Sequence, residues 1–279
     1  MGAADSVPGV SGGTMALIVG IYEDLIASIG SGFRALLSLV RLRLPEALGH
    51  LREVHWGLVV PLVFGIGSAL VVAARFIPHL LGTYPHHMRG LFLGMVAASI
   101  AIPWRRIDRV TPRLWLITIV AAVAAFLFSG LPTASGAEPT KLVVFVSAAV
   151  AICAMILPGV SGAFLLEVLG MYEPTLGALN DRDVAYVLTF GAGAALGLGS
   201  FSLLLKELLA RRHDETMAAL VGLMAGALRA LWPWQDAART LSLPGDEASA
   251  LTVAIITIAG FGFVVLLERT ARNKTMNHG

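Results

Sequence analysis

Long apolar segments separated by short polar ones run through most of the sequence. Six of them approach the roughly 17–20 residues that a helix needs to cross a hydrocarbon core of about 30 Å. They are residues 58–75, 88–103, 114–131, 186–205, 217–232 and 251–267, and the middle one of each half is the shortest. The pattern predicts an all-α, polytopic membrane protein.

Two further apolar segments share a motif that interrupts helices. Pro-Gly-Val-Ser-Gly occupies residues 8–12 and again residues 158–162, and eight of sixteen positions are identical between residues 8–23 and 158–173. A Pro-Gly break at matching places in two halves of an apolar chain points to a transporter binding site between the halves. We therefore predict an internal duplication, with repeat one in residues 1–132 and repeat two in residues 140–270.

Composition supports a bilayer environment and excludes several function classes. Charged residues make up 14% of the chain and apolar residues 57%, whereas a soluble domain carries about 25% charged residues. The basic residues stand in short loops between apolar segments, so we do not expect nucleic-acid binding. Cys153 is the only cysteine, which excludes an internal disulfide and a thiol metal cluster, and we predict no metal site.

The distribution of basic residues predicts the orientation of the chain. Basic residues crowd the loop at 105–113, the segment 206–212 and the tail at 269–274, whereas residues 131–140 carry none. If the loops rich in basic residues and both termini are cytoplasmic, the six spans cross the membrane in alternating directions. Residues 141–180 must then enter and leave on the outer side, and the first motif on the inner side. The two repeats are therefore predicted to have inverted topology, each with a re-entrant hairpin and three transmembrane helices.

Length arithmetic favours a re-entrant motif but leaves an alternative open. The eleven residues from Ser11 to Tyr22 span roughly 16 Å of helix, about half of the hydrocarbon thickness. Two short helices that each cross the whole membrane would leave the flanking loops on the same sides. Repeat two has an apolar helix at 142–157 before its motif, whereas repeat one has only residues 1–7 there. We expect that the first half-helix is missing and that the chain start is truncated or mis-assigned.

The motif residues favour backbone recognition of an anion. A half-helix that starts near Ser11 directs amide groups and its positive dipole end toward the membrane centre, which suits an anion. The hydroxyl groups of Ser11, Thr14 and Ser161 can cap a helix or donate hydrogen bonds. A simple kink with close packing is the alternative, and we favour the site because the motif is paired and inverted. Carbonyl groups of a helix ending at Leu157 aim at the same region, and could either bind a coupling H⁺ or Na⁺ or oppose the anion.

Charged residues at membrane depth are costly and are candidates for function. Glu167 is the deepest acid and could carry a proton or pair with an arginine. Arg229 could neutralise a phosphate, although snorkelling to the interface also explains it. We expect four residues at the interface: Tyr22, Glu23, Tyr172 and Glu173. The candidates for a role in coupling or gating are Glu23, Glu167, Tyr172 and Glu173.

The two motif copies, with the stretch Leu-Arg-Ala-Leu-Trp-Pro-Trp-Gln at residues 228–235, resemble the polyprenyl-phosphate transporter family, formerly a membrane domain of unknown function. The resemblance covers essentially the whole chain. It implies recycling of undecaprenyl phosphate, the lipid carrier of cell-wall sugars, across the bacterial cytoplasmic (inner) membrane, with a lipid substrate and no enzymatic activity. We expect alternating access at a midplane phosphate site.

The resemblance also implies a set of substrate-binding residues by position. These are Pro8, Gly9, Ser11, Gly12, Gly13 and Thr14 in the first copy, with Pro158, Gly159, Ser161 and Gly162 in the second. Ala163 and Phe164 replace the Gly-Thr of the first copy, so the halves are unequal.

Two other functions remain open at this stage. Undecaprenyl-pyrophosphate phosphatases have a related Pro-Gly-x-Ser-Arg-Ser-Gly motif, but no arginine follows Ser11 or Ser161, and a cation is expected to stabilise phosphoryl transfer. A small-anion channel or carrier is the other alternative, because a half-helix site does not require a lipid tail.

Overall fold

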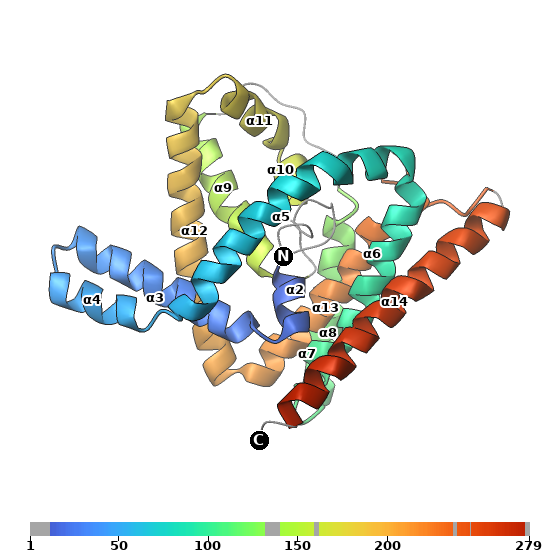
Figure 1. Cartoon of the computed structure of the whole chain (residues 1–279), viewed down its shortest axis with the longest axis horizontal. Coiled ribbons are helices and arrows are strands. Elements are labelled where there is room, and N and C mark those ends of the chain that lie inside the picture. The colour runs from blue at the N-terminus through green and yellow to red at the C-terminus, as the bar shows by residue number, and fades with distance from the viewer. Residues whose placement is uncertain (1–11, 132–139, 159–161, 237–238, 246, 277–279) are drawn as a thin grey trace.

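The computed structural model describes residues 12–131, 140–158, 162–236, 239–245 and 247–276, which are mainly helical (Figure 1). The N-terminal half contains α2 (Gly12–Val19), α3 (Tyr22–Val40), α4 (Leu44–Arg52), α5 (Trp56–Thr83), α6 (Pro85–Ser99), α7 (Ala101–Trp104) and α8 (Pro112–Phe128). The C-terminal half contains α9 (Lys141–Ile156), α10 (Gly162–Val168), α11 (Tyr172–Asn180), α12 (Val184–Arg211), α13 (His213–Ala227), the 3-10 helix η1 (Leu228–Leu231) and α14 (Glu247–Met276). The predicted all-α class is confirmed.

Helices cover each of the six predicted spans. By length and composition, two described helices can cross a membrane on their own, at Val184–Arg211 and Ser249–Thr270. The short middle spans correspond to α6 and α13, which have 15 residues each and therefore rise only about 22 Å. Both helices are therefore as short as the sequence predicts. A separate short helix, α7 or η1, follows each of them.

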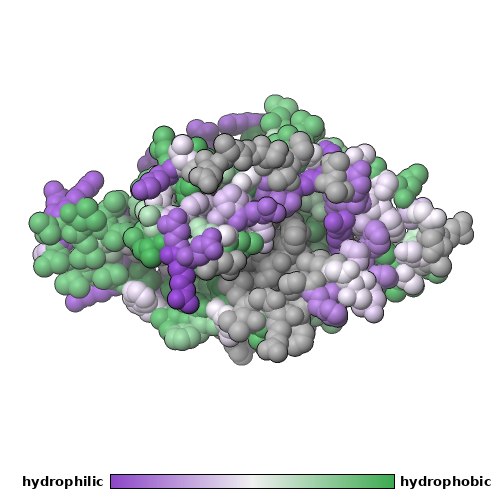
Figure 2. All heavy atoms as spheres, turned by 90° about the horizontal axis from the view of Figure 1, so that it is seen from above, coloured by the Kyte–Doolittle hydropathy of each residue, from purple (hydrophilic) through white to green (hydrophobic). Residues whose placement is uncertain are grey.

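Many large apolar side chains lie on the outside of the helices. Leu116 and Val120 of α8 are 62% and 59% exposed, and Ile258 of α14 is 71% exposed. Figure 2 shows apolar side chains over much of the surface, including the end formed by α3 and α4. Soluble monomers rarely expose apolar patches of this extent. The surface fits a membrane protein.

The two motif helices end in the same turn. Gly20 follows α2 and Gly170 follows α10, with φ of 81° and 67°. In each copy, the glycine and the next residue donate their N–H groups to the last turn of the helix: Gly20 to Leu17 and Ile21 to Ala16, and 150 residues later Gly170 to Glu167 and Met171 to Leu166. This hydrogen-bond pattern is a Schellman motif, which needs a left-handed residue and therefore favours glycine.

The middle helix of each half packs on the last helix of the other half. Helix α6 lies along α14, and α13 lies along α8 (Figure 1). A Cβ atom at Gly94 of α6 would overlap the carbonyl oxygen of Thr257, and one at Gly222 of α13 would overlap the carbonyl oxygen of Thr118. Both helix pairs therefore depend on direct backbone contact at a glycine, which small residues permit in membrane helices.

Replacement of Gly94 by leucine tests these contacts. The side chain would be forced against the backbone of α14, and overpacking of this kind costs about 1–3 kcal/mol. We expect Gly94→Leu to lower the free energy of unfolding by about that amount in detergent micelles. Gly262→Leu on α14 is the matched control, because no atom lies within 4 Å of its Cβ position. Equal melting temperatures for the two variants would contradict the packing argument.

Candidate functional site

The first motif helix lies in the middle of the molecule, between segments of both halves. Helix α2 contacts α6 and α7 from its own half and α9 and α14 from the other (Figure 1). Gly12 and Gly13 are buried, and Thr14 is completely shielded from solvent. The described part of the first motif thus faces protein rather than lipid.

The second motif helix begins against the same part of α9. A Cβ atom at Gly162 would come within 2.6 Å of the carbonyl oxygen of Ala151 and would overlap the side chain of Met155. Met155 in turn lines a cavity with Gly12 and Gly13 at the start of α2. Gly12, Gly13 and Met155 therefore line one cavity, and Gly162 packs on the same turn of α9 as Met155.

The end of α9 is buried, and one of its carbonyl groups accepts a hydrogen bond from the other half. Helix α9 ends at Ile156, Leu157 adopts an extended conformation (φ −73°, ψ 126°), and Pro158 is buried. The hydroxyl group of Tyr22 donates to the carbonyl oxygen of Ile156 at 3.2 Å. The sequence did not decide whether the carbonyl groups at the end of α9 bind a coupling cation or oppose the anion. One of these carbonyl groups already has a hydrogen-bond partner within the protein.

Tyr22 differs from the expectation of an interfacial aromatic residue. Its side chain is only 1% exposed and belongs to the main apolar core, whereas Tyr172 at the equivalent place in the second copy is 41% exposed. The sequence could not separate the two tyrosines, because the difference arises from the distant partner Ile156. Glu173 is likewise exposed, in the first turn of α11.

Part of the predicted substrate site is not covered by the structure. Pro8, Gly9, Ser11, Gly159 and Ser161 lie outside the described residues. The predicted motif residues that are described are all buried in the protein: Gly12, Gly13, Thr14, Pro158 and Gly162. Arg229, the other predicted binding residue, is half-buried.

Glu167 forms an ion pair, which was one of the two roles considered for it. Its carboxylate lies 3.1 Å from the guanidinium group of Arg239, whose side chain is only 12% exposed. Arg239 belongs to the segment between η1 and α14, and it also donates to the carbonyl oxygen of Leu131 at 3.2 Å. The second motif helix is therefore tied to the loop that follows the short helix of its own half.

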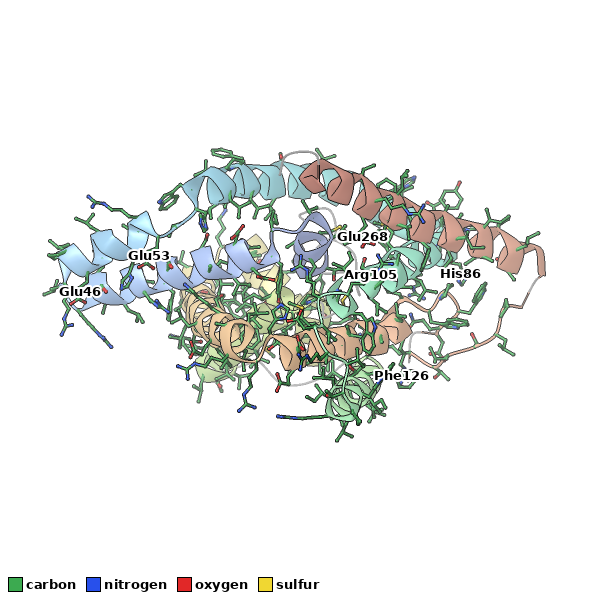
Figure 3. The ribbon with its side chains drawn as sticks, turned by 90° about the horizontal axis from the view of Figure 1, so that it is seen from below. Glu46, Glu53, His86, Arg105, Phe126 and Glu268 are labelled. Carbon is green, nitrogen blue, oxygen red and sulfur yellow. The ribbon has the colours of Figure 1, made fainter. Side chains whose placement is uncertain are left out.

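A second ion pair ties the first motif segment to the corresponding loop. Arg106, which follows α7, binds Glu23 at the start of α3 with an N–O distance of 2.8 Å. In the same loop Arg105 binds Glu268 of α14 at 2.8 Å (Figure 3). Two backbone N–H groups of this loop also donate to the carboxylate of Asp214, at 3.2 and 3.3 Å. These hydrogen bonds hold the pKa of Asp214 below its usual value.

Arg229 is placed against the end of α8. Its guanidinium group donates to the carbonyl oxygen of Phe126 at 3.2 Å and lies 4.6 Å from the centre of the Phe126 ring. A cation beside the last carbonyl groups of a helix stabilises the negative end of its dipole. Among the described residues these partners belong to α8, so the structure does not join Arg229 to the motif helices.

An apolar cavity that no sequence motif predicts adjoins the start of α2. It has a volume of about 410 Å³ and is lined mainly by α3, α5 and α9, together with Gly12 and Gly13. The lining residues run from Gly12 to Leu198 and follow no motif.

The sequence is similar to those of known transporters. Residues 1–247 match a family model described as undecaprenyl phosphate translocase-like. The chain is 41% identical over 239 residues to a polyprenyl-phosphate transporter of Vibrio cholerae, an alignment that covers 85% of this chain and 76% of the relative. It is 27% identical over 296 residues to a polyprenyl-phosphate transporter of Staphylococcus aureus, covering 98% and 95% of the two chains. No solved structure matches the chain.

Removal of the Tyr22 hydroxyl group tests the contact between the halves. Tyr22→Phe leaves a buried carbonyl group at Ile156 without its donor, and such a loss costs about 1–3 kcal/mol. We expect a corresponding decrease in the free energy of unfolding. Tyr172→Phe, at the exposed equivalent position, should change it by less than about 0.5 kcal/mol. Equal effects of the two substitutions would show that the hydrogen bond does not stabilise the protein.

Proposed function

Since the chain belongs to the undecaprenyl phosphate translocase-like family, we propose that it carries undecaprenyl phosphate, or a similar polyprenyl phosphate, across the bacterial cytoplasmic membrane. The match over residues 1–247 carries this conclusion, and the 41% identity to a curated polyprenyl-phosphate transporter agrees with it. The protein is a transporter and not an enzyme, as the resemblance of its motifs implied.

The phosphate group binds where the starts of α2 and α10 approach α9. The positive end of a helix dipole favours an anion, and glycines allow the ligand to approach the backbone closely. Ser11, Thr14 and Ser161 supply hydroxyl donors, which replace the water that a phosphate loses when it enters the membrane. The burial of Gly12 and Thr14 between both halves supports a site shielded from lipid.

The two repeats are inverted copies, at residues 1–132 and 140–270. Two observations support this arrangement: the reciprocal packing of α6 on α14 and α13 on α8, and the identical turns at Gly20 and Gly170. The turns at Gly20 and Gly170 end α2 and α10 soon after each motif, which supports half-helices rather than full spans. The basic loops put both termini in the cytoplasm.

Transport proceeds by alternating access, and the two ion pairs act as gates. Each pair joins an acid of a motif segment to the loop after the short helix of the same repeat: Glu23 to Arg106, and Glu167 to Arg239. In inverted repeats these loops lie on opposite sides of the membrane. Ion pairs in contact with solvent contribute only about 0–1 kcal/mol. The acid of each pair is about half exposed, Glu23 at 51% and Glu167 at 45%, so each gate can open and close reversibly. Tyr172 and Glu173 lie beside the second gate along the chain and have the same role.

Translocation by the reconstituted protein tests the function. Proteoliposomes that contain the wild-type chain should move undecaprenyl phosphate between leaflets, and a proton or Na⁺ gradient should reveal any coupling ion. Ser11→Ala combined with Ser161→Ala should lower apparent affinity by roughly tenfold for each hydroxyl donor lost to the phosphate. Ser68→Ala is the control, because Ser68 only bonds the carbonyl groups of its own helix.

Two results would overturn this function. Release of inorganic phosphate from undecaprenyl pyrophosphate by the purified protein would make it a phosphatase. Chloride or phosphate flux in liposomes without a lipid substrate would make it a small-anion channel or carrier.

Charge exchange tests the gates. Glu167→Arg and Arg239→Glu should each slow translocation by about fivefold, which corresponds to a coupling energy on the order of 1 kcal/mol. The double exchange should restore most of the rate, because it rebuilds the pair with opposite polarity. Exchange of the exposed pair Arg43 and Glu46 is the control and should have no effect. If the double variant is as slow as the single ones, the residues act separately and do not form a gate.

A further inference from the structure

The apolar cavity beside α2 has the size of a ligand pocket. Its volume of about 410 Å³ lies within the roughly 300–1,000 Å³ typical of small-molecule sites. Ile29 and Gly32 of α3, Val59 and Ile66 of α5, and Met155 of α9 form its walls. Gly12 at the start of α2 forms one end.

The chemistry of the lining fits a hydrocarbon. No charged side chain lines the cavity among the described residues. The polar groups there already have partners in the protein. Tyr22 donates to Ile156, Ser28 accepts from the backbone N–H of His55 at 3.3 Å, and the indole of Trp56 donates to Leu51. A polar head group would find few hydrogen-bond partners in the cavity. An apolar chain forms no hydrogen bonds and therefore loses none when it enters.

The cavity joins the phosphate site to the outer surface of the helices. Gly12 and Gly13 belong both to the proposed phosphate site and to the cavity wall. At another part of the wall, Val63 of α5 is 62% exposed, and the neighbouring Phe64 is 76% exposed. A ligand with an anionic head and a long apolar chain could therefore place its head at α2 and run its chain outward along α3 and α5.

We propose that this cavity binds the isoprenoid units next to the phosphate group of the transported lipid. The inference rests on the proposed function, and it adds that the protein recognises the chain as well as the head. Lipid is as apolar as the cavity, so the hydrophobic effect gives little net affinity. The contribution of the cavity is packing, which fixes the direction in which the chain leaves the phosphate site.

Photolabelling tests the cavity directly. The probe is undecaprenyl phosphate with a diazirine on the isoprene unit nearest the phosphate, added to proteoliposomes. We expect the label on peptides from α3 and α5. Unlabelled undecaprenyl phosphate should compete, and the same concentration of phosphatidylglycerol should not. Equal competition by phosphatidylglycerol, or label found only outside these helices, would overturn the proposal.

Gly32→Leu provides the matching variant. No atom lies within 4 Å of the Cβ position of Gly32, so a leucine can enter the cavity without displacing the backbone. We expect about a tenfold loss of apparent affinity in the photolabelling, equivalent to about 1.4 kcal/mol, with a parallel loss of translocation. Gly191→Leu on α12 is the control, since its Cβ position is equally open and lies outside the cavity.

The outcomes separate this inference from the function on which it rests. Wild-type protein that translocates the lipid but gives no cavity label refutes the cavity and leaves the transporter intact. Wild-type protein that does not translocate refutes the function itself. If Gly32→Leu fails to fold, as judged by its melting temperature, the wild-type label and its competition profile still decide the question.

Discussion

A helix that ends inside a membrane leaves polar backbone groups where no water can bind them, so that protein or ligand must surround the break. The described motif residues meet this requirement. The end of α9 at Ile156 and the buried Pro158 are enclosed by other helices, and Tyr22 reaches across from the other half to bond a carbonyl group at the break. Helix α2 is likewise surrounded by helices of both halves. A membrane protein that keeps such a break in its core has a place that can receive a polar ligand.

Much of the fold follows from local sequence, and much of the site does not. The helices that cover the six spans follow from apolar segments of sufficient length, and the paired turns at Gly20 and Gly170 follow from a repeated glycine. The ion-pair partner of Glu167 could not be predicted from the sequence, because Arg239 lies 72 positions away in a loop with no periodic pattern. The same holds for the burial of Tyr22 and for the cavity, which arise only when distant helices meet.

The two halves resemble each other without being equal. Gly13 and Thr14 in the first copy correspond to Ala163 and Phe164 in the second. Helix α3 has 19 residues, whereas its counterpart α11 has nine. Tyr22 is buried and Tyr172 is exposed. The two motif segments therefore have different surroundings, although eight of their sixteen aligned residues are identical.

The glycine contacts between α6 and α14, and between α13 and α8, limit how the protein can change shape. Two backbones in direct contact have no side chains between them that could change rotamer to absorb sliding. Each helix pair therefore resists sliding at its glycine. Tyr84 and Arg212, the residues just before α6 and α13, have nearly the same backbone angles (φ −131°, ψ 55° and φ −137°, ψ 53°). The chain therefore enters both helix pairs through the same bend.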